Sequence, residues 1–237
     1  MRELIERYVR ELVKIPSTSN TETEKSCADY IAEELAKQPY FKEYPEQTGK
    51  YLLPEDSFGR SVPWGLVKGR NGSRKTIILT GHYDVVDTEE YENERALAYD
   101  VEKWENLVKS GNALPGMPEE VKEDFLSGEW MFGRGTADMK GGLSVGLALL
   151  DWYGKLVVEA ERKDCGTAAF ETKTASGTEE TPEISRNLLF VTVPDEEGYS
   201  AGMRGAVPFL NDLIWLLYNV IFTLYFLKED VFQHPLV

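Results

Sequence analysis

The sequence predicts an α/β protein, because segments patterned as strands alternate with segments patterned as helices. Short β-branched and aromatic runs are bounded by turn residues, and Asn187 to Val193 is the clearest of them. A longer segment, from about Met139 to Tyr153, is apolar nearly all round, which is typical of a buried helix. Apolar residues near the N-terminus recur at helical spacing.

Two helices are expected at the start of the chain. Apolar residues between Leu4 and Leu12 predict a first helix that ends before Pro16. The sequence Thr21-x-x-Glu24 has the pattern of a capping box, in which the two side chains satisfy free N–H groups of a helix start. A second helix should therefore begin there, and Pro39 should end it.

Strands and polar insertions follow. Val62 to Lys68 and Lys75 to Thr80 read as strands separated by a turn-rich segment. Residues from about 88 to 130 are mostly polar and acidic, and they predict an insertion with short helices. A second polar insertion is expected at about 155 to 186, where Thr, Glu, Ala, Ser and Gly predominate.

The C-terminal segment Leu213 to Leu227 is strongly apolar. A membrane-spanning helix needs ~20 apolar residues, so this segment is short for one. We interpret it as a helix to about Tyr218 followed by a core strand from Val220 to Leu227. A membrane anchor is the minor alternative.

Composition excludes several kinds of partner. Asp and Glu number 41 against 26 Lys and Arg, which gives a net charge of −15. Such a surface repels nucleic acid and anionic membranes.

Cys27 and Cys165 lie far apart, so a disulfide framework is not expected. The charged N-terminus has no apolar signal core, and a cytoplasmic location is the simplest expectation.

His82 and Asp84 follow the predicted strand Lys75 to Thr80. Residues two apart in an extended segment project to the same side, so both side chains can face one site. Imidazole is a good zinc ligand, and a nearby carboxylate can hold its orientation. An isolated HxD pair is, however, more often structural or accidental.

A glycine-rich segment, Phe132 to Gly142, leads into the predicted buried helix and carries Asp138. The two oxygens of this carboxylate could bridge two metal ions ~3.5–4 Å apart. The alternative is an aspartate that only caps the helix. A phosphate loop is disfavoured, because both GxxxxGK[ST] and a full GxGxxG are absent.

Glu196 and Glu197 come just after the strand that ends at Val193. In a site, adjacent carboxylates take different roles, one binding metal and the other exchanging protons. A solvated acidic loop is the alternative. All three acidic segments lie at a strand end or a glycine-rich turn, where open α/β sheets place their sites, so we expect them to form one site.

The order HxD, GRGxxDMKGG and DEE resembles the co-catalytic zinc peptidases and deacylases. That family includes glutamate carboxypeptidases, acetylornithine deacetylases, succinyl-diaminopimelate desuccinylases and aminoacylases. The opening segment Leu12 to Ser17 is also similar to the family's. Gly128 to Thr136 and Val193 to Arg204, with the long excursion between His82 and Asp138, look most like the arginine-utilisation (RocB-type) branch.

The resemblance runs to about Leu210 and implies a fold and a reaction. The implied fold is a three-layer αβα sandwich with a mixed, largely parallel sheet. Residues 1–237 would form the N-terminal portion of the catalytic domain, without the family's lid and dimerisation domain, which leaves the oligomeric state open. The implied reaction is hydrolysis of an amide bond in a small molecule or short peptide, in amino-acid (arginine) catabolism, with two Zn²⁺ ions or with cobalt or manganese instead.

Roles carried over from the resemblance concern five side chains. His82 and Glu197 resemble metal ligands, and Asp138 resembles the carboxylate that bridges both metals. Asp84 matches the aspartate that steadies the histidine. Glu196 looks like the general base.

Two parts of the family's pattern depart or are absent. A further carboxylate ligand is expected after the apolar tail, at Glu229 or else at Asp230. The family's last ligand is a distant histidine, which His234 does not match. The alternative function is therefore a catalytically inactive, truncated remnant with a partial metal site. Arg134 and Lys140 are interpreted as a turn-stabilising residue and a surface residue.

Overall fold

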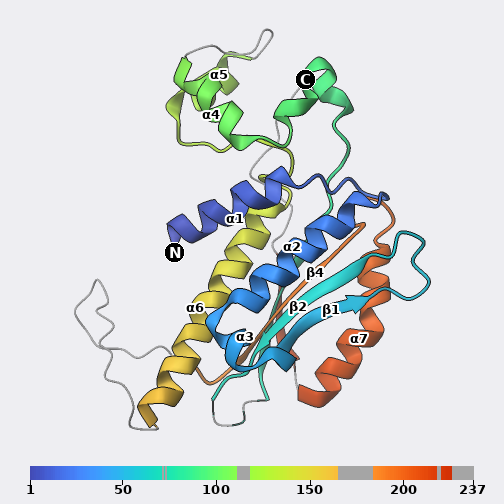
Figure 1. The fold of residues 1–237 in the computed structure, drawn as a ribbon, viewed down its shortest axis with the longest axis vertical. Helices are drawn as coiled ribbons and strands as arrows, with labels where there is room; N and C mark the ends of the chain where they lie inside the picture. The colour runs from blue at the N-terminus through green and yellow to red at the C-terminus, as the bar shows by residue number, and fades with distance from the viewer. Residues whose placement is uncertain (71, 73, 111–117, 165–183, 218–219, 226–237) are drawn as a thin grey trace.

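The computed structural model describes residues 1–70, 72, 74–110, 118–164, 184–217 and 220–225. Within these residues, a five-stranded mixed sheet lies between helices on both faces (Figure 1). The strands are β1 (Thr48–Leu52), β2 (Ser61–Val67), β3 (Thr76–His82), β4 (Asn187–Val193) and β5 (Val220–Tyr225). The helices are α1 (Arg2–Lys14), α2 (Thr23–Lys37), α3 (Pro39–Glu43), η1 (Pro45–Gln47), η2 (Glu89–Leu97), α4 (Val101–Ser110), α5 (Glu119–Ser127), α6 (Lys140–Asp164) and α7 (Ala201–Leu217).

The sheet order is β1-β2-β4-β3-β5. β4 and β5 each run parallel to β3, whereas β1 and β2 continue the sheet in antiparallel pairs. The register of β3 with β4 ends with His82 opposite Val193. The carboxyl ends of these two strands therefore meet at one edge, and the segments that leave them begin side by side.

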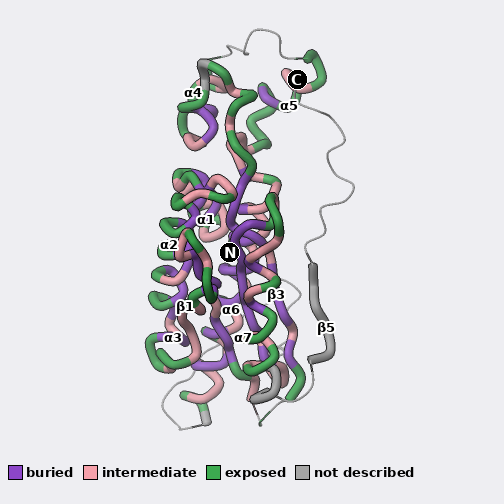
Figure 2. The backbone as a smooth tube through the Cα atoms, turned by 90° about the vertical axis from the view of Figure 1, so that its right-hand side faces the viewer, coloured by how far each residue is buried: buried purple, intermediate pink, exposed green. Residues whose placement is uncertain are grey.

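Two apolar clusters join the layers. On one face, α2, α3 and α6 pack against the sheet and α1 packs on α6, in one apolar cluster that includes Leu79 and Phe190. On the other face, α7 packs on Leu189 and Val191 through Ala206. Buried backbone accordingly runs through the middle of the molecule (Figure 2). The predicted α/β sandwich with a mixed sheet is confirmed.

The segment between β3 and α6 forms a separate lobe of η2, α4 and α5, seen at the top of Figure 1. Leu97, Trp104 and Phe125 form its own small apolar cluster. This accounts for the short helices expected between about 88 and 130. The sequence of the segment is mostly polar because the lobe that it forms buries few of its residues.

Strand positions were predicted well, with one exception. β2 and β3 begin and end within two residues of the predicted limits, and β4 has the predicted limits. β1 was missed, because its residues are exposed or only partly buried and give no apolar run.

Two predictions about helices are corrected. The capping box is wrong: α2 begins at Thr23 without a side-chain cap bond, and the carboxylate of Glu24 is buried among other partners. α6 continues to Asp164 instead of ending near Tyr153, because Val157 and Val158 extend its buried face. The first part of the insertion expected at 155–186 is thus helical, and residues 165–183 lie outside the described residues.

The apolar tail follows the preferred interpretation. α7 ends at Leu217, and β5 begins at Val220 and pairs with β3. In the part of the chain that the structure describes, no helix has the length and apolar character needed to cross a bilayer.

Candidate metal centre

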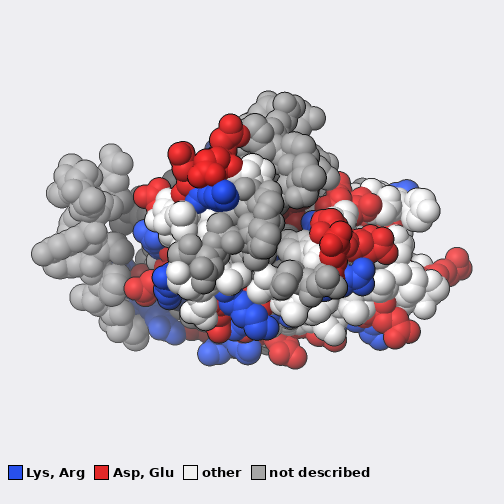
Figure 3. Space-filling model, turned by 90° about the horizontal axis from the view of Figure 1, so that it is seen from above, with Lys and Arg blue, Asp and Glu red and all other residues white. Residues whose placement is uncertain are grey.

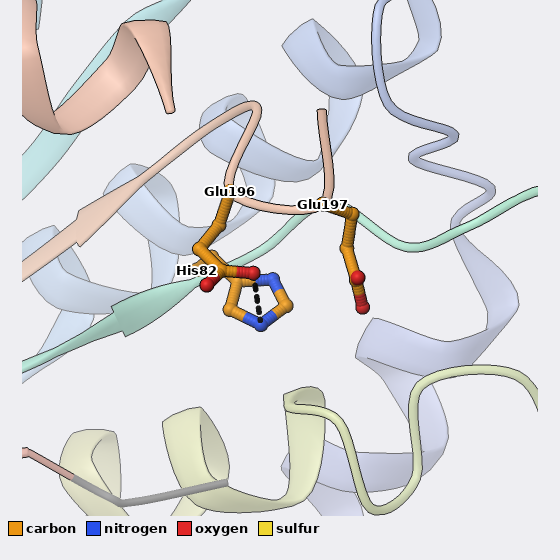
Figure 4. A group of neighbouring side chains, drawn as sticks. All are labelled: His82, Glu196 and Glu197. Carbon is orange, nitrogen blue, oxygen red and sulfur yellow. Dashed lines mark ion pairs between the residues drawn. The ribbon is translucent and has the colours of Figure 1, made fainter. Parts of the chain in front are cut away.

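The acidic segments predicted from the sequence meet at the carboxyl ends of β3 and β4. His82 is the last residue of β3, and Glu196 and Glu197 follow β4 after a short turn. Asp138 reaches the same place from the turn before α6, and its Oδ1 lies 3.0 Å from His82 Nε2. Figure 4 shows the imidazole and the Glu196 carboxylate facing each other, with Glu197 beside them.

Distances among these groups suit a shared cation. His82, Glu196 and Glu197 each offer a ligand atom, and these atoms all lie within 4.8 Å of one another. Glu196 Oε2 is 3.6 Å from His82 Nε2. The His82 side chain is only 5 % exposed, whereas those of Asp138 and Glu196 are 38 % and 44 % exposed. The imidazole is thus fixed in the protein, and the carboxylates reach solvent.

The orientation of His82 leaves Nε2 for a ligand. Nδ1 lies 3.0 Å from the backbone oxygen of Asp84, which can only accept, so Nδ1 is the donor. Burial disfavours the charged imidazolium, but hydrogen bonds with Asp138 and Asp84 outweigh burial and raise the pKa of His82 to about 10. The carboxylates around Nε2 therefore favour a positive charge at this point, either the proton of the imidazolium or a metal ion that replaces it.

Asp84 connects the two halves of the site. Its Oδ1 accepts the backbone N–H of Glu196 at 3.0 Å, and its Oδ2 accepts that of Glu197 at 3.0 Å. Ser19 Oγ donates to Oδ2 as well, at 2.6 Å. One buried carboxylate thus holds the loop after β4 against the end of β3.

The opening segment of the chain supports this end of β3. Ser19 N–H donates to Val85 O at 3.0 Å, and Val85 N–H donates to Ser17 O at 2.9 Å. Ser17 Oγ donates to Tyr83 O at 2.6 Å. The segment therefore lies beside the His82–Asp84 turn as an extended stretch of chain that is hydrogen-bonded to it. The similar sequence at Leu12 to Ser17 thus has a structural role.

The interpretation of Lys140 as a surface residue is wrong. Lys140 is fully buried, and its Nζ donates to Leu12 O at 3.0 Å and to Ile15 O at 2.7 Å. Both carbonyls lie at the C-terminal end of α1, where a cation is favoured, and Leu12 O also accepts the Ile15 N–H at 3.2 Å. Burial lowers the pKa of Lys140. The Arg134 side chain contacts Glu90, and its backbone N–H donates to Ala98 O at 2.6 Å.

Sequence reasoning missed three supporting residues, Ser19, Glu24 and Arg60. Glu24 and Arg60 form a buried ion pair, with Nη1 and Oε2 3.0 Å apart. The capping-box pattern hid the role of Glu24, and Arg60 belongs to no motif that would single it out. Glu229 and Asp230 lie outside the described residues.

The residues present fit a divalent cation. One imidazole nitrogen and several carboxylate oxygens converge, which is the mixed donor set that zinc and related ions accept. Asp and Glu side chains also gather in patches on the face seen in Figure 3, in keeping with the net charge of −15. Such a surface attracts cations.

Comparison with known proteins gives one clear relationship. The chain is 30 % identical to Protein RocB of Bacillus subtilis (strain 168) over 211 residues, which is 89 % of this chain and 32 % of RocB. The chain is a homologue of RocB. It is also 35 % identical over 203 residues to the uncharacterized protein YqjN of the same organism, covering 85 % of this chain and 31 % of YqjN. The predicted resemblance to RocB is confirmed, and the chain spans about a third of the length of RocB and YqjN.

Solved structures support the fold. Human carnosine dipeptidase 1 matches with a TM-score of 0.54 at 12 % identity, over 92 % of this chain and 38 % of the dipeptidase. At this identity the match concerns the fold alone. No protein-family model matches the chain.

Proposed function

We propose that this chain carries a metal-dependent hydrolase centre that cleaves amide bonds. The observation that carries the proposal is the convergence of His82, Asp138, Glu196 and Glu197 at the ends of two adjacent parallel strands. The homology to RocB agrees with the RocB-type branch of the amide hydrolases that the sequence resembles. The fold, shared with a dipeptidase, is one that can carry such a centre.

His82 Nε2, Asp138 and Glu197 are the proposed metal ligands. Zn²⁺ is the first candidate because the donors are imidazole and carboxylate, and cobalt or manganese would suit the same donors. Asp138 has two carboxylate oxygens and could serve two ions. A bound ion would supply Lewis acidity, which polarises a carbonyl and acidifies water.

Glu196 is the proposed general base. Its carboxylate is partly exposed and lies next to the proposed ligands, so it can contact both water and substrate. It would take a proton from the attacking water and pass that proton to the leaving amine. Asp84 would hold His82 and the Glu196–Glu197 backbone in place without touching substrate.

The proposed substrates are small amides, such as N-acyl amino acids or short peptides. The homology to RocB favours a role in amino-acid catabolism, and the arginine-utilisation branch is the specific proposal. The partly exposed carboxylates leave the site open to a small molecule from solvent.

Metal binding and hydrolysis measured together test this proposal. We would titrate the purified protein with Zn²⁺ by calorimetry and assay a panel of N-acyl amino acids and dipeptides. His82→Ala should lose metal binding, whereas Glu196→Gln should retain the metal and lose hydrolysis. Asp212→Asn, an exposed change on α7, is the control and should alter neither.

Each result has a definite meaning. Zinc-dependent hydrolysis that Glu196→Gln abolishes would support the proposal. Zinc binding without hydrolysis of any amide would favour a non-catalytic metal-binding domain. Absence of zinc binding in the wild-type protein would refute a metal centre formed by this chain.

A further inference from the structure

A buried charged network lies directly behind the candidate site. It consists of Glu24 in α2, Asp56 and Arg60 before β2, and Asp195 after β4. Glu24 is fully buried, Asp195 is 1 % exposed and Arg60 is 4 % exposed. Burying charges is costly unless each finds partners, so such a network calls for a specific reason.

Both oxygens of Glu24 accept hydrogen bonds. Oε1 accepts the backbone N–H of Asp195 at 2.9 Å, and Oε2 accepts Arg60 Nη1 at 3.0 Å. Asp195 immediately precedes Glu196 in the chain. The side chain of Glu24 therefore holds the first peptide of the loop that presents the proposed ligand and base.

Arg60 is itself held by Asp56. Asp56 Oδ1 accepts Arg60 Nε at 2.9 Å and Nη2 at 2.6 Å, and Oδ2 accepts the Arg60 backbone N–H at 2.8 Å. The guanidinium also lies over the Phe58 ring, with Cζ 5.1 Å from the ring centroid. It is thereby fixed in the plane that directs Nη1 toward Glu24. This fixes Glu24 in turn, because rotating its carboxylate would break the Arg60 contact.

The loop held by Glu24 has a demanding shape. Asp195 has a φ of +61°, in the left-handed region that non-glycine residues adopt uncommonly and that Asp tolerates better than most. Asp195 Oδ2 accepts the Ala201 N–H at 2.9 Å and so caps α7. A Cβ on Gly198 would clash with the side-chain ends of Asp195 and Asn20, so a larger residue there requires both side chains to move.

We propose that Glu24, oriented by Arg60, is a positioning residue that sets the Asp195–Gly198 loop so that Glu196 and Glu197 face His82. This inference rests on the proposed metal-dependent function. It assigns Glu24 no contact with metal or substrate. Its effect passes through the Asp195 peptide to the two residues that follow.

Glu24→Gln is the decisive substitution, because it preserves the size of the side chain. Each oxygen of Glu24 faces a donor, so an amide in either orientation places its NH₂ against the Asp195 N–H or against Arg60. The matched control is Glu34→Gln. Glu34 is a buried carboxylate of the same helix, bound to Arg7 and Lys37 and not to the loop.

Amide hydrogen exchange, resolved at single residues by NMR, tests the positioning without any metal. In Glu24→Gln we expect the amides of Asp195, Glu196 and Glu197 to exchange about tenfold faster, with central β4 amides unchanged. Zn²⁺ titration should show affinity about 10–100-fold weaker, as for other residues that support metal ligands. Glu34→Gln should change neither quantity by more than about twofold.

Loop exchange and zinc affinity in folded Glu24→Gln within about twofold of wild type would overturn the inference. Should Glu24→Gln fail to fold, the variant E24M/D56N/R60M/D195N removes all four charges of the network together, which buried ionic groups tolerate better than the loss of one partner, and the amide oxygen introduced at position 195 can still accept the Ala201 N–H. It also removes the acceptor for the Asp195 N–H and carries the same prediction. If the wild-type protein binds no zinc, the proposed function fails, but the exchange comparison still decides whether Glu24 positions the loop.

Discussion

Asp84 is buried and surrounded by donors, and this explains its place in the site. Its carboxylate accepts from Ser19 and from the backbone N–H groups of Glu196 and Glu197. Burial opposes ionisation, but the hydrogen bonds with His82 and Ser19 outweigh burial and lower the pKa of Asp84. The ionised form is thus the one that joins β3 to the loop after β4.

Asp84→Asn should therefore weaken the site without removing a proposed ligand. An amide in either orientation turns its NH₂ toward the N–H of Glu196 or of Glu197. We expect Zn²⁺ affinity to fall about 10–100-fold, measured by calorimetry. Asp212→Asn serves as the exposed control, and equal zinc affinity in both variants would contradict this role of Asp84.

Asp56 should affect how the stability of the folded protein depends on pH. Burial alone would raise its pKa, but the bonds from the Arg60 side chain and backbone lower it below the usual value. A lowered pKa in the folded state contributes stability that is present above the unfolded pKa of about 3.9 and is lost as pH falls through the folded value. Asp56→Asn should remove part of the loss of stability below about pH 4, measured by urea unfolding at a series of pH values. An unchanged acid slope would show that Asp56 does not contribute.

Local patterns predicted the residues that face the site but not those behind it. The predicted residues lie in short motifs at strand ends or at a glycine-rich turn, where open α/β sheets place their sites: His82, Asp84, Asp138, Glu196 and Glu197. The roles of Glu24 and Lys140 depend instead on contacts between segments distant in the sequence. Their local surroundings resemble a helix cap and a surface position, so tertiary structure alone reveals them.

At the scale of elements, Lys140 links the N-terminal end of α6 to the C-terminal end of α1. The Lys140 ammonium donates to Leu12 O and Ile15 O at the C-terminal end of α1, where a cation is favoured. Lys140 is two residues from Asp138, so this contact also ties the Asp138 turn to α1. Contacts between distant segments also explain why the edge strand β1 was missed. β1 is held by its pairing with β2, and its own residues provide little apolar pattern.

Lys140→Met should destabilise the protein by about 1–3 kcal/mol, because it leaves two carbonyls without their charged donor. Urea unfolding would measure the change. Lys103→Met is the control, since the Lys103 side chain forms an exposed pair with Asp100, for which a change of about 0–1 kcal/mol is expected. Equal effects of the two substitutions would argue against the capping role of Lys140.

At the scale of the molecule, the lobe of η2, α4 and α5 is docked on α1 of the sandwich. Arg10 and Lys14 of α1 pair with Glu105 and Glu102 of α4. Val101, the first residue of α4, joins the apolar side of α1 in a small buried cluster. The lobe is therefore held on this side by a mixture of charged and apolar contacts.

The same lobe also touches the segment that leads to the site. The Arg134 side chain contacts Glu90 of η2, and the Arg134 backbone N–H donates to Ala98 O. Asp138 follows Arg134 by four residues. The docking of the lobe therefore bears on the turn that carries a proposed metal ligand.

The charged part of this docking predicts a salt-sensitive lobe. Partly exposed ion pairs contribute about 0–1 kcal/mol each and weaken as salt screens them, whereas the Val101 contact does not weaken. The double variant Arg10→Ala/Lys14→Ala should speed proteolytic cleavage within residues 88–130 at low salt and reduce the further effect of added salt, because, of the charged contacts named, only the Arg134–Glu90 pair remains. Arg2→Ala, which removes the Arg2–Glu6 pair within α1, is the control and should be cleaved like the wild type. If the cleavage rates of the wild type and the double variant depend equally on salt, apolar packing alone holds the lobe. The place of the lobe beside the site would then not depend on ionic strength.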